Sequence, residues 1–382
     1  MNILLVSGTH PRTPHISGVR AGRFAEELAR LGHRCVLLCP TVPGEAEQID
    51  SIADHDWSMP YIAAVTDPAP PVTAGAFARL GTAIRLLRHG GNRVGLYRAM
   101  LTRWRHLAPG FPVDAVWTTF GSLESVFVAR RIARGASAPW LLDVKDNPDI
   151  YVPRLLRRAL AWRLRGFGAL QSNAELHADA ATRWLGQPAE LVYSGVDSCF
   201  FPKAPPPPRR YVTLVGALYH RHLLDAFVDG VAAFNRNAAS PIEIVHLGAQ
   251  IAMLEESATR HDGHVPVSSP GYVAPAQMAA ICQSALANCY VFFGWGFHHK
   301  LFELLACRRP VIAYGGELRE SLSAAERLHA PLLTPDSPAL LRAALEEIDT
   351  PGYAIDPRLP PRFFTWPEQA AMVDAAMRRM TA

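Results

Sequence analysis

The sequence predicts an α/β protein made of two doubly wound halves, and three observations support this prediction. Short apolar runs ending in small residues alternate with amphipathic helical segments along most of the 382 residues. Strand, helix and strand within about 40 residues form a βαβ unit, which places its strands in a parallel sheet. The alternation stops at a proline-rich segment, FFPKAPPPPRR, and then starts again.

The first half begins with a buried strand, NILLVSG, which ends in glycine. The helix SGVRAGRFAEELARLGH follows, with Gly32 near its end, and leads to the strand RCVLLCP. The remaining strands expected in this half, separated by helical segments such as SLESVFVARRIAR, are DAVWTTF, APWLLDVKD, GALQSN and AELVYSG.

After the prolines the same alternation returns. The strands expected in the second half, each followed by a helical segment, are YVTLVGA, IEIVHLG, ANCYVFF and PVIAYGG. A last helix, WPEQAAMVDAAMRRM, follows. Ligands of doubly wound sheets bind beyond the carboxyl ends of the strands, so we expect the site in a cleft between the two halves.

Prolines mark the expected domain boundary, because they stiffen a connection and cannot continue a helix or a central strand. We therefore predict four parts: an N-terminal domain over residues 1–201, a hinge at 202–209, a C-terminal domain over 210–363 and a closing helix at 364–382.

Composition and targeting signals indicate a folded cytoplasmic protein. Hydrophobic residues make up 49% of the chain and charged residues 19%, which is far from a disordered composition. No apolar run reaches the ~18 residues of a membrane-spanning helix. The start, MNILLVSGTHPRT, lacks the features of a signal peptide. The six cysteines form no CxxC pair, which favours buried free thiols.

Positive charge is concentrated in two stretches that carry no acidic residue. Seven arginines lie between Asp67 and Asp114, and five lie between Asp149 and Glu175, with Leu, Trp or Phe at helical spacing. Basic amphipathic helices favour an anionic membrane surface, and the alternative is a solvated arginine-rich face. Nucleic acid is not an expected partner, since stacking platforms and known motifs are missing.

The segment FHHKLFELLACRRPVIAYGG contains the strongest candidate site residues. Lys300 and Glu303 lie one turn apart at the start of a short helix that follows the loop FFGWG. Helix N-termini bind anions, and a lysine there is unfavourable unless an anion is present. Glu303 has the chemistry to accept hydrogen bonds from a ribose diol. The alternative is an ordinary Lys–Glu pair on the surface.

A second cation follows the strand that ends at Gly216. Arg221 begins the next helix and is suited to bidentate binding of a diphosphate. His220 and His222 flank it, but no third ligand is close in sequence, so a metal is not expected.

These segments together resemble family four of the glycosyltransferases, which have the GT-B fold of two Rossmann-like domains. FHHKLFELLACRRPVIAYGG is the most specific match, since Lys and Glu hold the nucleotide-sugar in that family. YSGVD resembles the segment before the hinge. The other matching segments are SGTHPRTPHISGVRAGRFAEELARLGHRC, DAVWTTFGS, LLDVKDNPD, LQSNAELHADAATRWLG, LVYSGVDSCFF, VTLVGALYHRH and SPGYVAPAQMAAICQSA.

The resemblance implies an acceptor domain, a donor domain and a closing helix that packs back on the first domain. Glu303 would bind the ribose, Arg221 and Lys300 the diphosphate, and Gly18 would lie near the phosphates and the acceptor. The donor-binding residues implied in this way are Gly18, Gly216, Tyr272, Val273, Gly294, Trp295, Gly296, Phe297, His298 and Glu303. Trp295 stands where the family often has a second Glu, and it offers a stacking face in place of a carboxylate.

The activity implied is transfer of a sugar from a UDP- or GDP-linked donor, with retention, to a saccharide or lipid-linked acceptor in cell-surface glycan synthesis. An inverting enzyme needs a base, for which Asp146 is the first candidate and His10 the second. Asp54 and Asp56 spell a DxD motif, but they lie outside the expected nucleotide strands, so no metal is expected. An epimerase or hydrolase of the same fold and a catalytically inactive partner subunit are the alternatives.

Overall fold

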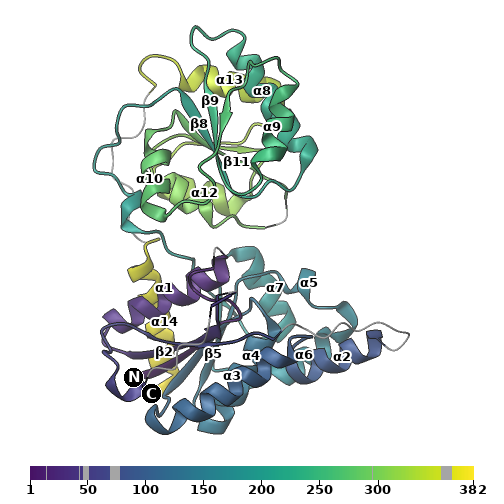
Figure 1. The fold of residues 1–382 in the computed structure, drawn as a ribbon, viewed down its shortest axis with the longest axis vertical. Helices are drawn as coiled ribbons and strands as arrows, with labels where there is room; N and C mark the ends of the chain where they lie inside the picture. The colour runs from purple at the N-terminus through teal and green to yellow at the C-terminus, as the bar shows by residue number, and fades with distance from the viewer. Residues whose placement is uncertain (14, 43, 46–50, 69–77, 295, 354–363) are drawn as a thin grey trace. The chain divides into compact units, whose positions relative to one another are not determined.

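The computed structural model describes residues 1–13, 15–42, 44–45, 51–68, 78–294, 296–353 and 364–382, and these form two compact units (Figure 1). The first unit comprises Met1–Gly195 and Trp366–Ala382, and the second comprises Val196–Thr365. Each unit contains one wholly parallel sheet, of seven and six strands respectively. The predicted fold class, two doubly wound α/β domains, is confirmed.

The sheet of the first unit has the strand order β3-β2-β1-β4-β5-β6-β7. Its strands are β1 (Asn2–Val6), β2 (Arg34–Pro40), β3 (Tyr61–Val65), β4 (Ala115–Thr119), β5 (Trp140–Val144), β6 (Ala169–Ser172) and β7 (Glu190–Leu191). The helices are α1 (Ile16–Arg30), α2 (Ala78–His89), α3 (Val94–Leu107), α4 (Leu123–Ala136), α5 (Pro148–Tyr151), α6 (Arg157–Leu164), α7 (Glu175–Leu185) and α14 (Trp366–Thr381).

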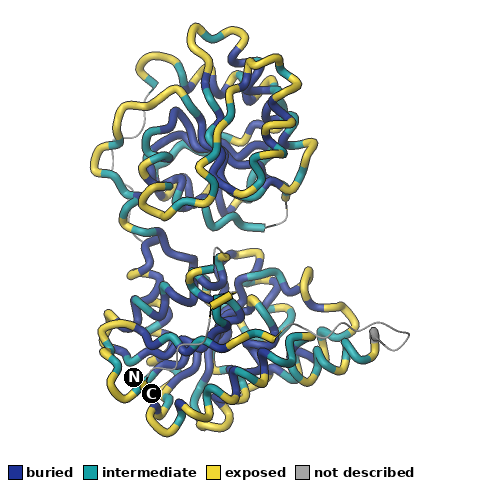
Figure 2. The backbone as a smooth tube through the Cα atoms, viewed as in Figure 1, coloured by how far each residue is buried: buried dark blue, intermediate teal, exposed yellow. Residues whose placement is uncertain are grey.

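Helices cover both faces of this sheet, which is why its central strand β1 is almost wholly apolar. Alternate residues of β1 face opposite sides. Ile3 and Leu5 pack in the core formed with α1 and α14, whereas Leu4 and Val6 pack in the core formed with α3 and α4. Figure 2 shows that the most deeply buried segments lie in the interior of the unit, and β1, β4 and β5 are among them.

The helix α14 belongs to the first unit although it lies beyond the second unit in the sequence. It packs along α1, and the Trp366 ring meets Phe24 edge to face at 5.6 Å. His33 Nε2 lies 2.8 Å from Asp374 Oδ1. The last helix therefore completes the core on one face of the first sheet.

The sheet of the second unit has the order β10-β9-β8-β11-β12-β13. Its strands are β8 (Tyr211–Val215), β9 (Glu243–Leu247), β10 (Val267–Ser268), β11 (Ala287–Val291), β12 (Val311–Tyr314) and β13 (Leu332–Leu333). The helices are α8 (Arg221–Asn235), α9 (Ile251–Thr259), α10 (Pro275–Ser284), α11 (Lys300–Ala306), α12 (Arg319–Arg327) and α13 (Pro338–Ile348).

The chain passes between the units at 195–196 and 365–366, where Val196 and Thr365 form a parallel bridge. The proline run predicted as the hinge, residues 202–209, lies within the second unit. Arg308 donates to the carbonyl of Lys203 at 2.8 Å, and Arg309 donates to the carbonyl of Pro206. These bonds hold the prolines against the second unit instead of leaving them as a free connection.

Candidate functional site

The candidate site lies at the carboxyl edge of the second sheet, where the strand order reverses. The chain winds outward in one direction from β8 to β10 and in the other from β11 to β13. Loops that follow β8 and β11 therefore run apart, and this switch point is where open α/β sheets bind ligands. Gly216 follows β8, and the loop from Phe292 to His299 follows β11 and leads into α11.

Lys300 reaches across this switch point. Its Nζ donates a hydrogen bond to the carbonyl of Val215, the last residue of β8, at 2.6 Å. The same atom lies 5.1 Å from the centre of the Tyr290 ring in β11. Gly216 has a φ of +100°, and a Cβ on it would collide with Nζ. Glycine is therefore required there both by the backbone and by the lysine.

Burial of Lys300 disfavours its charged form. It lowers the pKa of Lys300 to about 8, and the nearby Glu317 carboxylate opposes this shift. An ammonium group has three donors, and the carbonyl of Val215 takes one of them. An anion bound here would gain a cation already fixed in position.

Glu317 is a site residue that the sequence analysis did not single out. It follows β12 after Gly315 and Gly316, accepts a hydrogen bond from Tyr290 Oη, and accepts another from the backbone N–H of Leu318 at 2.7 Å. Burial raises its pKa, while the bond from Tyr290 and the charge of Lys300 work against this. The sequence signal that could have identified Glu317 is a carboxylate directly after a predicted strand and two glycines.

Glu303 lies one turn along α11 from Lys300, as predicted. Its side chain is 23% exposed, and Oε1 lies 4.0 Å from His299 Nε2. Burial raises the pKa of Glu303 to about 8, and the negative charge of Asp197 raises it further. At neutral pH the carboxyl group therefore carries a proton and has a donor as well as acceptors for a ligand hydroxyl.

Two neutral histidines border the same strand ends. The His298 ring is surrounded by Tyr290, Phe292 and Phe293, and burial lowers its pKa to about 3. His246 Nδ1 lies 2.9 Å from the carbonyl of Leu214. Within the described residues, Nε2 of both rings is buried without a partner. Each ring thus retains one nitrogen for a ligand.

The loop before α11 has the backbone freedom expected of a ligand loop. Gly294 and Gly296 have φ values of +80° and +149°, which favour glycine. Phe297 packs on Phe302 of α11 at 5.1 Å. Trp295, predicted to face the sugar, lies outside the described residues.

Arg221 is held differently from Lys300. It begins α8, and its Nε lies 2.9 Å from Asp225 Oδ1 while Nη1 lies 2.6 Å from Glu256 Oε2. Its side chain is 44% exposed. Binding of a diphosphate by this guanidinium would compete with the two carboxylates.

Tyr272 and Val273, predicted to lie near the base, follow the short edge strand β10. The Tyr272 side chain is exposed and Val273 is half-buried. Both are therefore in the second unit with the other donor residues, on the β9 side of the switch point.

The predicted residues of the first unit lie at the carboxyl edge of its own sheet. Asp146 follows β5 and accepts a hydrogen bond from Lys145 Nζ at 2.5 Å. Gly18 lies in α1 against His10, since a Cβ on Gly18 would collide with the His10 carbonyl. Close packing of the helix on this loop accounts for the glycine.

His10 is buried, and its Nδ1 accepts a hydrogen bond from the backbone N–H of Arg12 at 3.1 Å. Burial lowers its pKa, with a further contribution from Arg12. A neutral ring that accepts at Nδ1 carries its proton on Nε2. His10 is therefore arranged to donate a hydrogen bond.

Within the described part of the chain, no group of three or more His, Cys, Asp or Glu side chains is arranged to hold a metal ion. Asp56 of the DxD motif accepts bonds from the backbone and hydroxyl of Ser58, in the manner of a turn.

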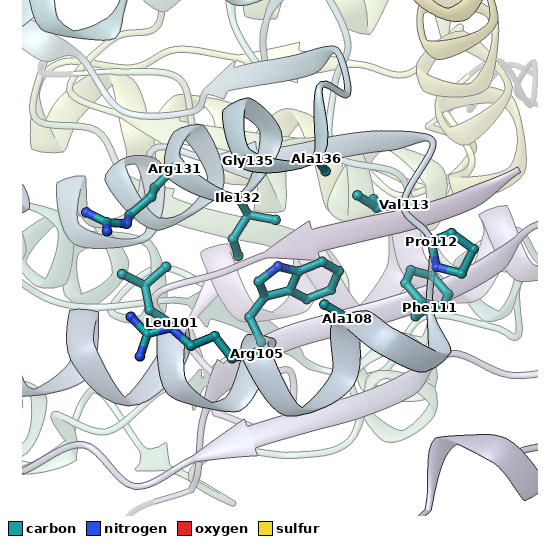
Figure 3. Close-up of a pocket in the computed structure, with 11 residues that line it drawn as sticks. Leu101, Arg105, Ala108, Phe111, Pro112, Val113, Arg131, Ile132, Gly135 and Ala136 are labelled. Atoms are coloured by element: carbon teal, nitrogen blue, oxygen red, sulfur yellow. The ribbon is translucent and has the colours of Figure 1, made fainter.

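A pocket of about 340 Å³ in the first unit contains none of the predicted site residues (Figure 3). Side chains of α3 and α4, including Leu101, Arg105 and Ile132, line it together with Phe111–Val113. These last residues directly precede β4, so the pocket lies where the strands begin. Ligands of this architecture bind at the opposite edge, so we do not assign the pocket to the reaction.

Solved structures with the same architecture identify the fold. Sucrose-phosphate synthase from Thermosynechococcus elongatus matches over 99% of this chain and 98% of its own, with a TM-score of 0.71 and 15% identity. The chain has the GT-B fold. A UDP-forming α,α-trehalose-phosphate synthase from Burkholderia xenovorans, another GT-B protein, matches over 100% and 99% of the two chains with a TM-score of 0.64 and 14% identity.

A third GT-B protein, HepE from Anabaena in complex with UDP and glucose, matches over 100% of this chain and 95% of its own, with a TM-score of 0.62 and 14% identity. No protein-family model and no curated protein matches the sequence. The fold is therefore the property that these comparisons share.

Proposed function

We propose that the protein is a glycosyltransferase that takes its sugar from a nucleotide-diphosphate donor. The observation that carries the proposal is Lys300, fixed by Val215 and Tyr290 at the switch point of the second sheet. Structures of the same fold that contain UDP or UDP-glucose support this class of donor. The uncharged Glu303 carboxyl group one turn away suits a ribose diol.

Each predicted donor residue then has a part. Lys300, with Arg221 as a second cation if it leaves its carboxylates, holds the diphosphate, and Gly216 allows close approach. The loop from Gly294 to His298 lines the sugar, with Tyr272 and Val273 near the base. Negative charge grows on the departing diphosphate, and Lys300 stabilises it there. Removing one such donor costs roughly 10²–10³ in kcat in other enzymes.

We infer a hexose donor and a retaining reaction, in which the acceptor hydroxyl passes its proton to the leaving phosphate oxygen. This needs no protein base, and it agrees with a His10 ring that is arranged to donate. If the reaction inverts instead, Asp146 is the candidate base, at the expense of its bond to Lys145.

A lipid-linked acceptor at a membrane surface, for polysaccharide synthesis, is the finer part of the proposal. Large apolar side chains are exposed among or next to the arginines of residues 150–165, including Tyr151, Leu155 and Trp162. Exposed aromatic and apolar groups interleaved with arginines favour an anionic interface. No helix among the described residues has the length and hydropathy needed to span the bilayer.

Thermal unfolding in the presence of UDP, GDP and their sugars tests the donor class. We expect a nucleoside diphosphate to raise the Tm of the wild type and to lose this effect in the Lys300→Met variant. Product analysis without acceptor separates the alternatives, since an epimer or a free sugar would indicate an epimerase or hydrolase. A protein that none of these ligands stabilises would be a partner subunit, and the proposal would be wrong.

A further inference from the structure

The two arginine-rich stretches of the sequence come together in the first unit around a small pocket. Helices α2 and α6 contact one another, and α2 also contacts α4 (Figure 1). Between these helices and α3 lies a pocket of about 260 Å³. Its lining residues are Arg88, Tyr97, Phe127, Arg130, Arg131, Arg134 and Arg163.

No carboxylate lines this pocket. The three chain segments that supply its arginines, residues 68–113, 125–142 and 150–174, contain no Asp or Glu. Within the described part of the chain, none of the five guanidinium groups makes an ion pair or a hydrogen bond. Other arginines of the same unit are paired, for example Arg93 with Asp67 and Arg157 with Asp149. The five charges are thus gathered without an internal counter-charge.

Arg130 is the central member of the group. Its Nε is buried without a hydrogen-bond partner among the described residues, and burial together with Arg134 and Arg163 lowers its pKa. Arg163 lies over the Phe127 ring at 6.0 Å, which steadies its guanidinium. Arg130 is therefore both partly desolvated and repelled by its neighbours.

Helix electrostatics explain only part of the cluster. Arg134 lies in the last turn of α4, where the helix dipole favours a cation. Arg88 and Arg163 lie in the last turns of α2 and α6, whose dipoles likewise favour a cation, whereas Arg130 and Arg131 lie before the last turn of α4. A bound anion would neutralise all of them at once.

We propose that the five-arginine pocket binds a phosphoryl group. Guanidinium forks match phosphate oxygens bidentately, and an unpaired set of them is the usual design of a phosphate site. The volume is below that of a typical drug-sized site, which suits a compact anion. The pocket is in the first unit, whereas the donor residues are in the second, so it is a separate site. The group comes either from a lipid headgroup or from a soluble phosphate compound.

The double variant Arg130→Gln/Arg134→Gln tests the pocket. Its matched control is Arg154→Gln, which removes an exposed arginine of the same arginine-rich stretch outside the pocket. Isothermal titration with inorganic pyrophosphate and flotation with vesicles containing phosphatidic acid, against vesicles of phosphatidylcholine alone, are the two arms. Lys300→Met is titrated in parallel so that anion binding in the second unit is recognised and subtracted.

We expect the double variant to bind at least one probe about tenfold or more weakly, while the control binds like the wild type. Loss for the vesicles alone identifies a lipid headgroup, and loss for pyrophosphate identifies a soluble compound. Arg130→Lys/Arg134→Lys, which keeps the charge and loses the fork, should be intermediate. Unchanged binding of both probes, or an equal loss in Arg154→Gln, would overturn the proposal. Circular dichroism verifies that each variant is folded.

Discussion

The carboxyl edges of the two sheets differ in how their charges are balanced. In the first unit, Arg20 and Asp143 form a fully buried bidentate pair, with Nε–Oδ2 at 2.9 Å and Nη2–Oδ1 at 2.6 Å. In the second unit, Lys300 has a carbonyl and an aromatic ring as its nearest partners. At the edge of the first sheet, Arg20 is paired with a carboxylate of the protein. At the edge of the second sheet, Lys300 is a cation that a bound anion would stabilise.

This difference separates structural charge from charge kept for a ligand. Arg20 also donates to the Val192 carbonyl at 2.7 Å and to Ser194 at 3.2 Å, so its donors are used within the protein. Around Lys300 the pKa values of Lys300, Glu303 and His298 are all displaced by burial. Displaced pKa values at a strand edge are typical of functional sites.

The largest effect is expected from breaking the satisfied pair. Arg20→Met leaves Asp143 buried without its partner, which should lower the free energy of unfolding by about 3–5 kcal/mol. For a unit of this size that corresponds to a fall in Tm of very roughly 6–20 °C by calorimetry. Arg23→Met is the control, because Arg23 pairs with Glu26 at a partly exposed position of the same helix. Equal losses in both variants would contradict the assignment.

Removing the ligand-directed cation should instead affect function. Lys300→Met should slow sugar transfer roughly 10²–10³-fold and weaken nucleotide binding, because the growing charge on the diphosphate loses its nearest donor. Steady-state kinetics and calorimetric titration with UDP measure this. Lys203→Met, at an exposed lysine of the same unit, should behave as the wild type. Normal turnover of the Lys300 variant would remove the basis of the proposed site.

The raised pKa of Glu303 predicts a pH dependence of stability. Its pKa is about 8 in the folded protein against an ordinary 4.5, so folding binds a proton between these values. The stabilisation is complete below pH 4.5 and is lost as pH rises through 8. Glu303→Gln should therefore gain on the order of 2 kcal/mol relative to the wild type from pH 5 to pH 8, allowing for its partial exposure.

Scanning calorimetry at three pH values measures that relative gain. Glu255→Gln, at an exposed position of α9, should show no such trend. Parallel pH profiles for Glu303→Gln and the wild type would show that the carboxyl group ionises normally in the folded protein.

The smallest effect is expected at Arg221. Because Asp225 and Glu256 already neutralise it, Arg221→Gln should weaken UDP binding about tenfold or less, and the difference should shrink at high salt. Titration at two salt concentrations tests this. A loss as large as that of Lys300→Met would mean that the arginine leaves its carboxylates when the donor binds.

Much of this arrangement could be predicted from the sequence, because it depends on local order. The apolar runs gave most of the strands, and Lys300 and Glu303 share a helix turn that spacing alone reveals. The edge strand β3 was missed because only five residues, YIAAV, separate two loops. Glu317 and His246 were missed because they meet Lys300 only through strand order, which the sequence does not state.

Two further predictions depended on contacts that lie far apart in the chain. The sequence predicts Arg221 to be a cation available for a ligand. In the structure α8 packs on α9, and this brings Glu256, 35 residues away, beside Arg221. The sequence predicts the prolines as a hinge, but in the structure Arg308 donates to the carbonyl of Lys203 and Arg309 to the carbonyl of Pro206. The sequence identifies Arg221 and the proline run as unusual, but the residues that contact them are known only from the fold.

The position of α14 imposes an order of events on folding. Phe24 and the neighbouring apolar residues of α1 remain uncovered during synthesis until the ribosome has made all of the intervening second unit and Trp366 emerges. The second unit has its complete sequence before the first unit does. We therefore expect a chain stopped at residue 365 to contain a folded second unit and an incomplete first unit that exposes the apolar residues of α1 and is prone to aggregate.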